Sequence, residues 1–201
     1  MKERSQLPSI EQVVDFHGHL CPGLALGYRT AKVALAALGC ERPRDEELVA
    51  VVENASCAVD AIQMVARCTF GKGNLAFRDY GKHVYTFFDR KSGRGVRVSE
   101  RYRGFDEDED FLSLREVVSS GEATLEQREA FRAAMRAKLE AILSAPEADF
   151  LVVTEVTDEP PPKARIEPSE DCAECGESTM ASRLVEVSGR RLCRECRARE
   201  G

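Results

Sequence analysis

Four cysteines near the C-terminus have the spacing of a tetrahedral metal site. They form two C-x2-C pairs that are separated by 17 residues: Cys172, Cys175, Cys193 and Cys196. Each pair can bind one ion through two thiolates, and two pairs complete the closed four-cysteine site that is typical of structural zinc. The surrounding segment contains few apolar residues, so we expect metal binding to supply most of its folding free energy. Two disulfides are the alternative, but the spacing favours one zinc ion in a small C-terminal domain.

A second group of metal-ligating or redox side chains lies near the N-terminus. His17, His19 and Cys21 occur within five residues, and the whole chain has only 3 histidines. Pro22 suits the first position of a helix, which makes Cys21 the N-cap residue. Cys57 begins a second predicted helix. Unpaired amides and the helix dipole favour a thiolate at both cysteines, and the two helix starts can bring all four side chains into one pocket.

The chemistry of this pocket depends on whether it binds a metal. Imidazole and thiolate ligands prefer zinc, iron or copper to magnesium or calcium, and three protein ligands leave a position open for water or substrate. Without a metal, a thiolate can act as a nucleophile or a redox group. In the alternative interpretation, the cysteines are small buried apolar residues and the histidines cap helices. The candidate catalytic residues are these four side chains and two polar neighbours: His17, His19, Cys21, Cys57, Asp60 and Lys72.

Helices and strands are mixed along the chain without regular βαβ alternation. Apolar residues recur at helical spacing after Pro22, and Gly39 suits the end of that helix. Three strand-like stretches separated by short turns follow the helix at Cys57, which predicts an antiparallel meander. The pattern predicts an α+β fold with helices packed on a mainly antiparallel sheet. We expect helices at 22–38, 57–67, 111–119 and 125–143, and strands at 48–52, 74–78, 83–89, 95–99 and 150–156.

The composition limits the class of protein. The chain has 201 residues, of which 43% are hydrophobic, so it can bury a core and is not a disordered protein. Its net charge of −6 argues against general affinity for nucleic acid or anionic membranes. No apolar run approaches the ~18 residues of a membrane span, and the polar N-terminus has no signal-peptide pattern. We therefore expect a cytoplasmic protein with reduced cysteines and no membrane contact.

Three consecutive prolines, at 160–162, divide the chain. Prolines lack amide donors and hold an extended backbone, which is typical of a linker. We expect a first domain over residues 1–158, a proline-rich linker over 159–168 and a zinc-finger domain over 169–201. Within the first domain, the acidic run at 106–110 is predicted to be a solvated loop that leads into a helix.

The C-terminal domain resembles the zinc finger of the DksA/TraR family over residues 172–184 and 192–196. Such fingers accompany a long coiled-coil hairpin in transcription regulators, and this sequence predicts no such hairpin. The resemblance therefore implies the fold of the finger rather than a role in transcription. Five arginines near the C-terminus can contact either phosphate or an acidic protein surface: Arg190, Arg191, Arg194, Arg197 and Arg199.

Three ordered segments, at residues 16–29, 53–63 and 68–75, resemble the family of FmdE, a formylmethanofuran dehydrogenase subunit. The resemblance extends over the first domain and implies an α+β core and a homodimer. It matches the two histidines and two cysteines of the N-terminal pocket with the family's motif positions. It also implies a genomic link to a molybdenum or tungsten oxidoreductase that interconverts CO₂ and formyl-methanofuran, which is then the partner to expect.

These observations favour a metal-binding accessory protein or a small redox enzyme, with structural zinc in its finger and a second transition metal in the N-terminal pocket. An enzyme of this kind has a metal- or thiol-dependent activity linked to formylmethanofuran dehydrogenase-type one-carbon metabolism. The first alternative is a non-enzymatic subunit or adaptor whose finger docks a partner oxidoreductase. A regulator that binds nucleic acid through the arginine-rich finger is the least favoured alternative.

Overall fold

The computed structural model describes residues 6–101 and 109–199. The chain divides into two compact units, Met1–Lys163 and Ala164–Gly201. The division falls within the predicted linker. The first unit extends to residue 163 because its end is held by Arg90, whose Nη2 donates to the Pro161 carbonyl at 2.7 Å. Of the predicted acidic loop, residues 106–108 lie outside the described residues.

The first unit is built on a five-stranded sheet with the strand order β2-β1-β3-β4-β5. Three of its four strand pairs are antiparallel, and only β1 and β2 run parallel. This arrangement confirms the predicted α+β fold on a mainly antiparallel sheet. The predicted antiparallel meander is wrong at its first strand, because β2 pairs in parallel with β1, which lies between β2 and β3. The strands are β1 (Leu48–Val52), β2 (Leu75–Phe77), β3 (Val84–Asp89), β4 (Gly95–Glu100) and β5 (Leu151–Val156).

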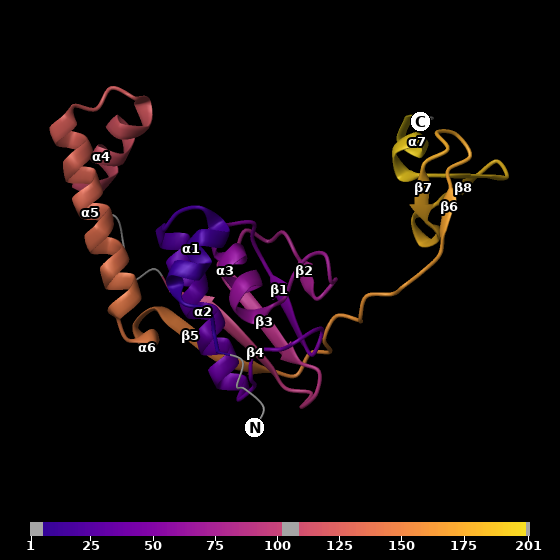
Figure 1. The fold of residues 1–201 in the computed structure, drawn as a ribbon, viewed down its shortest axis with the longest axis horizontal. Coiled ribbons are helices and arrows are strands. Elements are labelled where there is room, and N and C mark those ends of the chain that lie inside the picture. The colour runs from indigo at the N-terminus through magenta and orange to yellow at the C-terminus, as the bar shows by residue number, and fades with distance from the viewer. Residues whose placement is uncertain (1–5, 102–108, 200–201) are drawn as a thin grey trace. The chain divides into compact units, whose positions relative to one another are not determined.

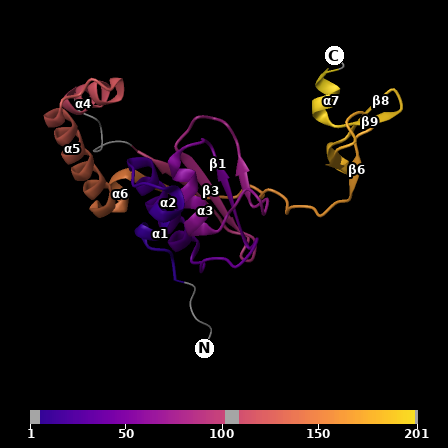
Figure 2. The same ribbon diagram turned by 45° about the horizontal axis from the view of Figure 1, so that its top comes forward.

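Three helices cover one face of this sheet (Figures 1 and 2): α1 (Ile10–His17), α2 (Pro22–Leu38) and α3 (Cys57–Ala66). Alternate strand residues point into the core between the two layers, where Phe87 and Tyr85 of β3 are fully buried. Helix α1 was not predicted from the sequence. Its start is nevertheless marked by a capping box, in which Ser9 and Gln12 bond to each other's backbone amides.

Helices α2 and α3 approach each other closely at their first turns. A Cβ atom at Gly27 would overlap the backbone of Ala58, its carbonyl oxygen first. A Cβ atom at Gly23 would lie 3.4 Å from the Cβ atom of Cys57. The two glycines therefore allow the N-terminus of α3 to pack directly against α2, and this contact fixes the positions of the two cysteines that begin the helices.

A helical hairpin is inserted between β4 and β5. It consists of α4 (Glu109–Ser120) and α5 (Leu125–Ser144), and the short α6 (Glu147–Phe150) leads back into the sheet. The hairpin projects away from the sheet in both views (Figures 1 and 2). Its base is held by the buried Arg29 of α2, which donates to the carbonyls of Ile142 at 2.7 Å and Ala145 at 2.7 Å. This guanidinium satisfies carbonyls at the negative end of α5.

The second unit contains two small antiparallel hairpins. Strand β6 (Ser169–Asp171) pairs with β7 (Ser178–Met180), and β8 (Val185–Val187) pairs with β9 (Arg190–Leu192). A short 3₁₀ helix, η1 (Ala181–Arg183), lies between the hairpins, and α7 (Arg194–Arg199) follows them. The small core consists of Leu192 and the buried cysteines.

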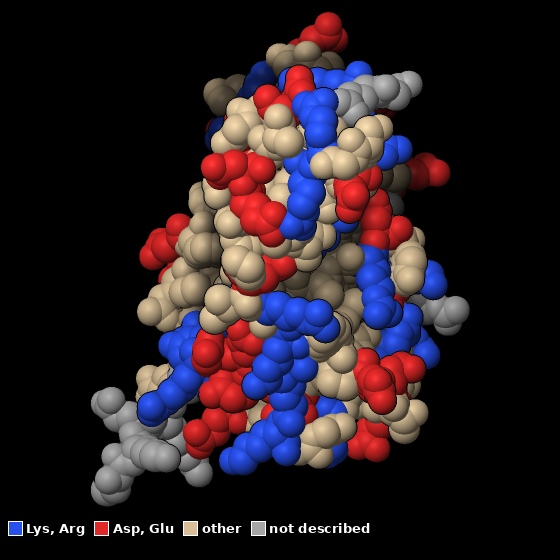
Figure 3. All heavy atoms as spheres, turned by 90° about the vertical axis from the view of Figure 1, so that its right-hand side faces the viewer, with Lys and Arg blue, Asp and Glu red and all other residues tan. Residues whose placement is uncertain are grey.

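Lysine and arginine side chains are interspersed with aspartate and glutamate on the face seen in Figure 3. Mixed charge of this kind is typical of an ordinary protein surface rather than of a nucleic-acid-binding face. Among the described residues, no helix combines the length and apolar character that crossing a membrane requires.

Candidate metal centres

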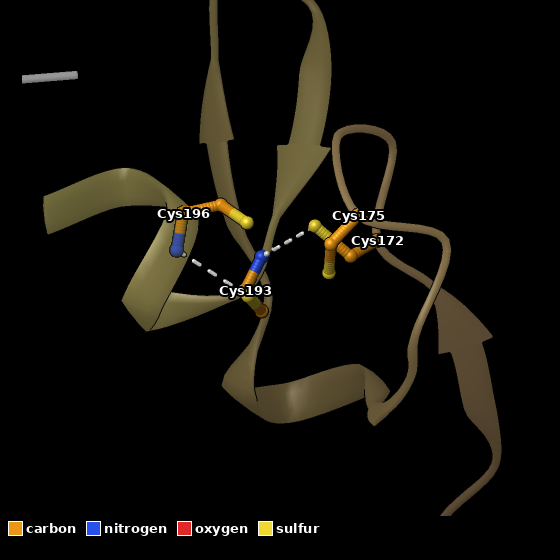
Figure 4. A group of neighbouring side chains, drawn as sticks. All are labelled: Cys172, Cys175, Cys193 and Cys196. Carbon is orange, nitrogen blue, oxygen red and sulfur yellow. Dashed lines mark hydrogen bonds between the residues drawn. The ribbon is translucent and has the colours of Figure 1, made fainter. Parts of the chain in front are cut away.

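The four C-terminal cysteines converge at the junction of the two hairpins and α7 (Figure 4). Their sulfur atoms all lie within 4.8 Å of one another. Two backbone amides donate to these sulfurs, from Cys193 to Cys172 Sγ at 3.2 Å and from Cys196 to Cys193 Sγ at 3.4 Å. Amide donors of this kind stabilise thiolates. The geometry is that of the four-cysteine zinc finger predicted from the sequence.

The charges of the four thiols also indicate a cation. Backbone amides, first that of Cys175, lower the pKa of Cys172 to about 6. The side chain of Cys193 and the other nearby thiols raise the pKa of Cys196 to about 12. Four thiols at this separation cannot all ionise beside one another unless a positive charge compensates them. A divalent ion with thiolate preference, such as Zn²⁺, provides that charge.

Three of the seven arginines of the finger pair with the finger's own acidic residues. Arg190 pairs with Glu174, Arg191 pairs with Glu170, and Arg199 pairs with Glu195. From residue 164 to the end, the sequence contains 7 arginines and 8 acidic residues. The finger is therefore not a basic surface, and this argues against phosphate binding as its main role.

The N-terminal motif forms a second cluster of ligand atoms. His17 is the last residue of α1, His19 lies in the following loop, and Cys21 is the N-cap of α2. One ligand atom from each of these residues lies within 4.8 Å of the others. The chain turns sharply between the histidines, where Gly18 has a φ of 97°, and the two imidazole rings are 4.6 Å apart between their centroids.

The orientation of His17 is set by Asp60 of α3. Its Nδ1 atom lies 2.7 Å from the Asp60 carboxylate of α3. Its Nε2 atom is buried and has no hydrogen-bond partner among the residues that the structure describes. A buried polar atom without a partner is costly, whereas a histidine that donates one ring N–H to a carboxylate commonly binds a metal through the other nitrogen.

Cys57 adjoins this cluster through Cys21. The two side chains interact, and Cys57 is the first residue of α3. The Cys21 sulfur accepts a hydrogen bond from the Leu24 amide at 3.4 Å, as expected at a helix N-cap. Nevertheless, burial raises the pKa of Cys21, and the neighbouring Cys57 raises it further, so the lowering by the Leu24 amide does not prevail. The helix N-terminus thus favours the Cys21 thiolate as predicted, but without a bound metal the effect of burial is larger.

Comparison with known proteins places the chain in a family. Residues 16–152 match the family described as "FmdE, Molybdenum formylmethanofuran dehydrogenase operon". The chain belongs to the FmdE family. Residues 165–200 match a second description, "Prokaryotic dksA/traR C4-type zinc finger". Both resemblances that were drawn from the sequence are thus confirmed.

Two similar proteins extend the comparison of this FmdE-family chain. It is 32% identical over 189 residues to a "Probable S-adenosyl-L-methionine-binding protein" of Archaeoglobus fulgidus. The match covers 90% of this chain and 50% of the relative, so the chain spans about half of that protein's length. The crystal structure of a tungsten formylmethanofuran dehydrogenase FmdE-like protein from Syntrophus aciditrophicus has the same fold, with a TM-score of 0.60 at 24% identity, covering 94% of this chain and 89% of that one.

Lys72 does not join the N-terminal cluster of the FmdE domain. Its Nζ donates to the carbonyls of Arg67 at 2.7 Å and Asp45 at 3.2 Å, beyond the C-terminal end of α3. Cys57 begins the same helix, and ten helical residues separate the two ends by about 15 Å. The glycines around Lys72 form the turn after α3, where the ammonium group satisfies the Arg67 carbonyl at the negative end of the helix.

Two supporting contacts in the FmdE domain were not predicted. Gln63 donates from Nε2 to the Asp60 carboxylate at 3.3 Å and so helps to position the carboxylate that holds His17. Asn54 accepts a hydrogen bond from Ser56 Oγ at 2.7 Å and donates to the Lys82 carbonyl at 2.7 Å, which fixes the loop before Cys57. Gln63 follows Asp60 by three residues on one helix, and this spacing is the signal that could have identified it.

Proposed function

We propose that the FmdE domain binds a transition metal through His17, His19 and Cys21, with Cys57 as the fourth ligand or beside an open position. The observation that carries this proposal is the orientation of His17, whose Nδ1 faces Asp60 and whose buried Nε2 has no partner among the described residues. Asp60 acts through His17: its carboxylate accepts the Nδ1 proton and leaves the Nε2 lone pair for an ion.

The ligand types select the metal. Two imidazoles and a thiolate suit zinc, iron or copper, whereas magnesium and calcium prefer oxygen. A bound ion supplies a Lewis acid or redox centre if one of its positions remains open to substrate. The protein supplies the two histidines from the turn after α1, the cysteine from the N-cap of α2, and the carboxylate from α3.

These features support the function of a metal-binding accessory protein or a small redox enzyme of one-carbon metabolism. The description of the family names the molybdenum formylmethanofuran dehydrogenase operon. This link supports a molybdenum or tungsten formylmethanofuran dehydrogenase as the partner. The free thiols at both centres suit a reducing compartment, for which we propose the cytoplasm.

The inserted helical hairpin supports a homodimer, or an adaptor role in which it docks the partner oxidoreductase. Only Phe111 of α4 and Leu139 and Ile142 of α5 are buried. Leu112 and Leu125 are 39% and 71% exposed. A long hairpin that buries so little of its own apolar surface is suited to cover a second chain. Light scattering at micromolar concentration is expected to give twice the mass of one chain, and a monomer would contradict the dimer.

Metal analysis of purified variants tests the N-terminal site. The wild-type chain is expected to contain two metal ions, one in the finger and one in the FmdE domain. The substitution His17→Ala should leave only the finger ion, because it removes the ligand that Asp60 orients. The matched control is His83→Ala, at the third histidine of the chain, which should retain both ions. One ion in the wild type, or no loss in His17→Ala, would refute the proposal.

A further inference from the structure

We propose that Cys21 and Cys57 form a redox-active dithiol, and that its oxidation by a peroxide or a small disulfide releases the metal from the N-terminal site. The dithiol is inferred from the packing of α2 and α3. The release of the metal rests in addition on the proposed function, because it requires that the site binds an ion.

The two cysteines are held together by the helices that they begin. Cys21 is the N-cap of α2 and Cys57 is the first residue of α3. A Cβ atom at Gly27 would overlap the Ala58 carbonyl oxygen, and a Cβ atom at Gly23 would contact the Cβ atom of Cys57 at 3.4 Å, so the start of α3 packs directly on α2. Each cysteine also packs against the main core, so neither helix start can turn away without disturbing that packing. The two sulfurs therefore remain neighbours whether or not a metal is present.

Solvent reaches both thiols of the Cys21–Cys57 pair, which distinguishes the pair from the buried Cys68. Cys21 and Cys57 are partly exposed, whereas Cys68 is buried. Cys40 is also partly exposed, but burial raises its pKa to about 11, and burial raises the pKa of Cys68 to about 12. Because the thiolate is the reactive form, both of these thiols are poor nucleophiles at neutral pH. Burial raises the pKa of Cys21 as well, so the selectivity for the pair rests on the core packing that keeps its two thiols together.

With hydrogen peroxide, the reaction is balanced by the two thiols alone. One sulfur attacks the O–O bond, becomes a sulfenic acid and releases one water molecule. The other thiol then displaces the sulfenic hydroxyl group, which leaves as a second water molecule while the S–S bond forms. Two thiols and one peroxide thus give one disulfide and two waters. A small disulfide instead accepts the two electrons and the two protons and leaves as two thiols.

Oxidation removes the sulfur ligands from the site. A disulfide sulfur carries no charge and binds a metal weakly, since the thiolate is the ligand form of cysteine. His17 and His19 then remain as the only members of the proposed ligand set. Two neutral imidazoles fill only two positions of a four-coordinate ion and leave the other two to water, so the ion dissociates. Reduction by a dithiol restores both thiols and the ligand set.

Peroxide treatment of the full-length protein tests the dithiol, with disulfides mapped by mass spectrometry of unreduced peptides. We expect a Cys21–Cys57 disulfide, reversal by dithiothreitol, and release of about one metal equivalent to a chromogenic chelator as the disulfide forms. In the Cys57→Ser variant, dimedone should trap Cys21 as a lasting sulfenic acid adduct, because no second thiol resolves it. The matched control, Cys40→Ser, should behave as the wild type.

The outcomes separate this inference from the proposed function. A protein that contains only the finger metal but still forms the Cys21–Cys57 disulfide would refute the N-terminal metal site and retain the dithiol. A protein that loses its N-terminal metal to peroxide without forming this disulfide would refute the inference and retain the metal site. Oxidation of Cys40 or Cys68 in preference to the pair would also refute the inference.

Discussion

His17 shows how a residue distant in sequence decides the chemistry of a motif. The motif supplies two imidazoles and a thiol within five residues, and this much is visible in the sequence. The carboxylate that orients His17 belongs to Asp60, 43 residues away on α3. From the sequence, Asp60 was a candidate because it flanks Cys57 and could add a carboxylate or orient a ligand, but His17 was not identified as its partner. A Cys21 thiolate was predicted from the helix terminus, because the burial that opposes ionisation arises only when the helices pack.

The substitution Asp60→Ala is expected to weaken metal binding at the N-terminal site by about 10–100-fold, because removal of the partner carboxylate releases the tautomer and orientation of His17. Asp60→Asn, which retains an acceptor oxygen, should have a smaller effect. Chelator competition measures both affinities. Asp15→Ala, an exposed position on α1, is the matched control, and equal losses in Asp15→Ala and Asp60→Ala would contradict the role given to Asp60.

Glu100 gives the fold a pH dependence. Its side chain is 2% exposed and lies near His83, with 3.4 Å between Oε2 and Nδ1. Burial raises the pKa of Glu100 from 4.5 to about 7, although a hydrogen bond from Thr30 opposes the shift. The folded state thus keeps a proton that the unfolded state loses, and this contribution to stability is complete below pH 4.5 and disappears as the pH rises to about 7.

Urea denaturation at pH 5 and pH 8 measures this dependence. Between these values the wild type should lose up to about 3 kcal/mol of unfolding free energy through Glu100, since one pKa unit corresponds to about 1.4 kcal/mol. Glu100→Gln, which stays neutral, should be less sensitive to pH by that amount. The control variant is Glu155→Gln on β5, whose side chain is 75% exposed. The same pH dependence in wild type and Glu100→Gln would disprove the assignment.

Helices with strong local signals were predicted well, and the order of the strands was not. The helix at 22–38 agrees with α2, where Pro22 and Gly39 mark both ends. Helix α1 was missed because eight residues give little periodicity. Ser56 precedes α3 as predicted but makes no capping bond, since its hydroxyl donates to Asn54. The parallel pairing of β1 with β2 depends on the packing of α3 and cannot be derived from local spacing.

The close contact of α2 with α3 predicts that a methyl group added at Gly27 destabilises the fold. Gly27→Ala should lower the unfolding free energy by about 1–3 kcal/mol, because its Cβ atom would overlap the backbone of Ala58 and force the helices apart. Metal binding at the N-terminal site should weaken as well, since the same contact positions Cys57. In Gly71→Ala, the added Cβ atom would meet nothing within 4 Å. Thermal denaturation of the two variants compares them directly, and equal stability would contradict this account.

The whole molecule consists of two units with different sources of stability. The first unit has a large apolar core between sheet and helices, whereas the core of the second consists of Leu192 and two buried cysteines. The division of the chain after Lys163 lies next to the proline run at 160–162. The exact end of the first unit could not be predicted from the sequence, because it depends on the contact of Arg90 with Pro161.

The substitution Cys175→Ser should remove the finger metal and unfold residues after about 166, because so small a core cannot fold without the ion. The first unit should keep its thermal transition and its own metal ion. Metal analysis and amide hydrogen exchange measure the two effects separately. Retained metal in the variant would show that Cys175 is not a ligand, and loss of protection throughout the FmdE domain would show that the units are not independent.

The helical hairpin begins and ends at adjacent positions of the sheet, since Glu100 of β4 and Leu151 of β5 are register partners. The ends of this 50-residue segment, 101–150, are therefore only about 5 Å apart. In topological terms, the hairpin is an insertion in the connection between two adjacent antiparallel strands. A two-residue turn such as Asn-Gly could close the same strands, so the sheet places no limit on the length or the helical content of this insertion. The hairpin can therefore vary in length or sequence without a change in the strands that frame it.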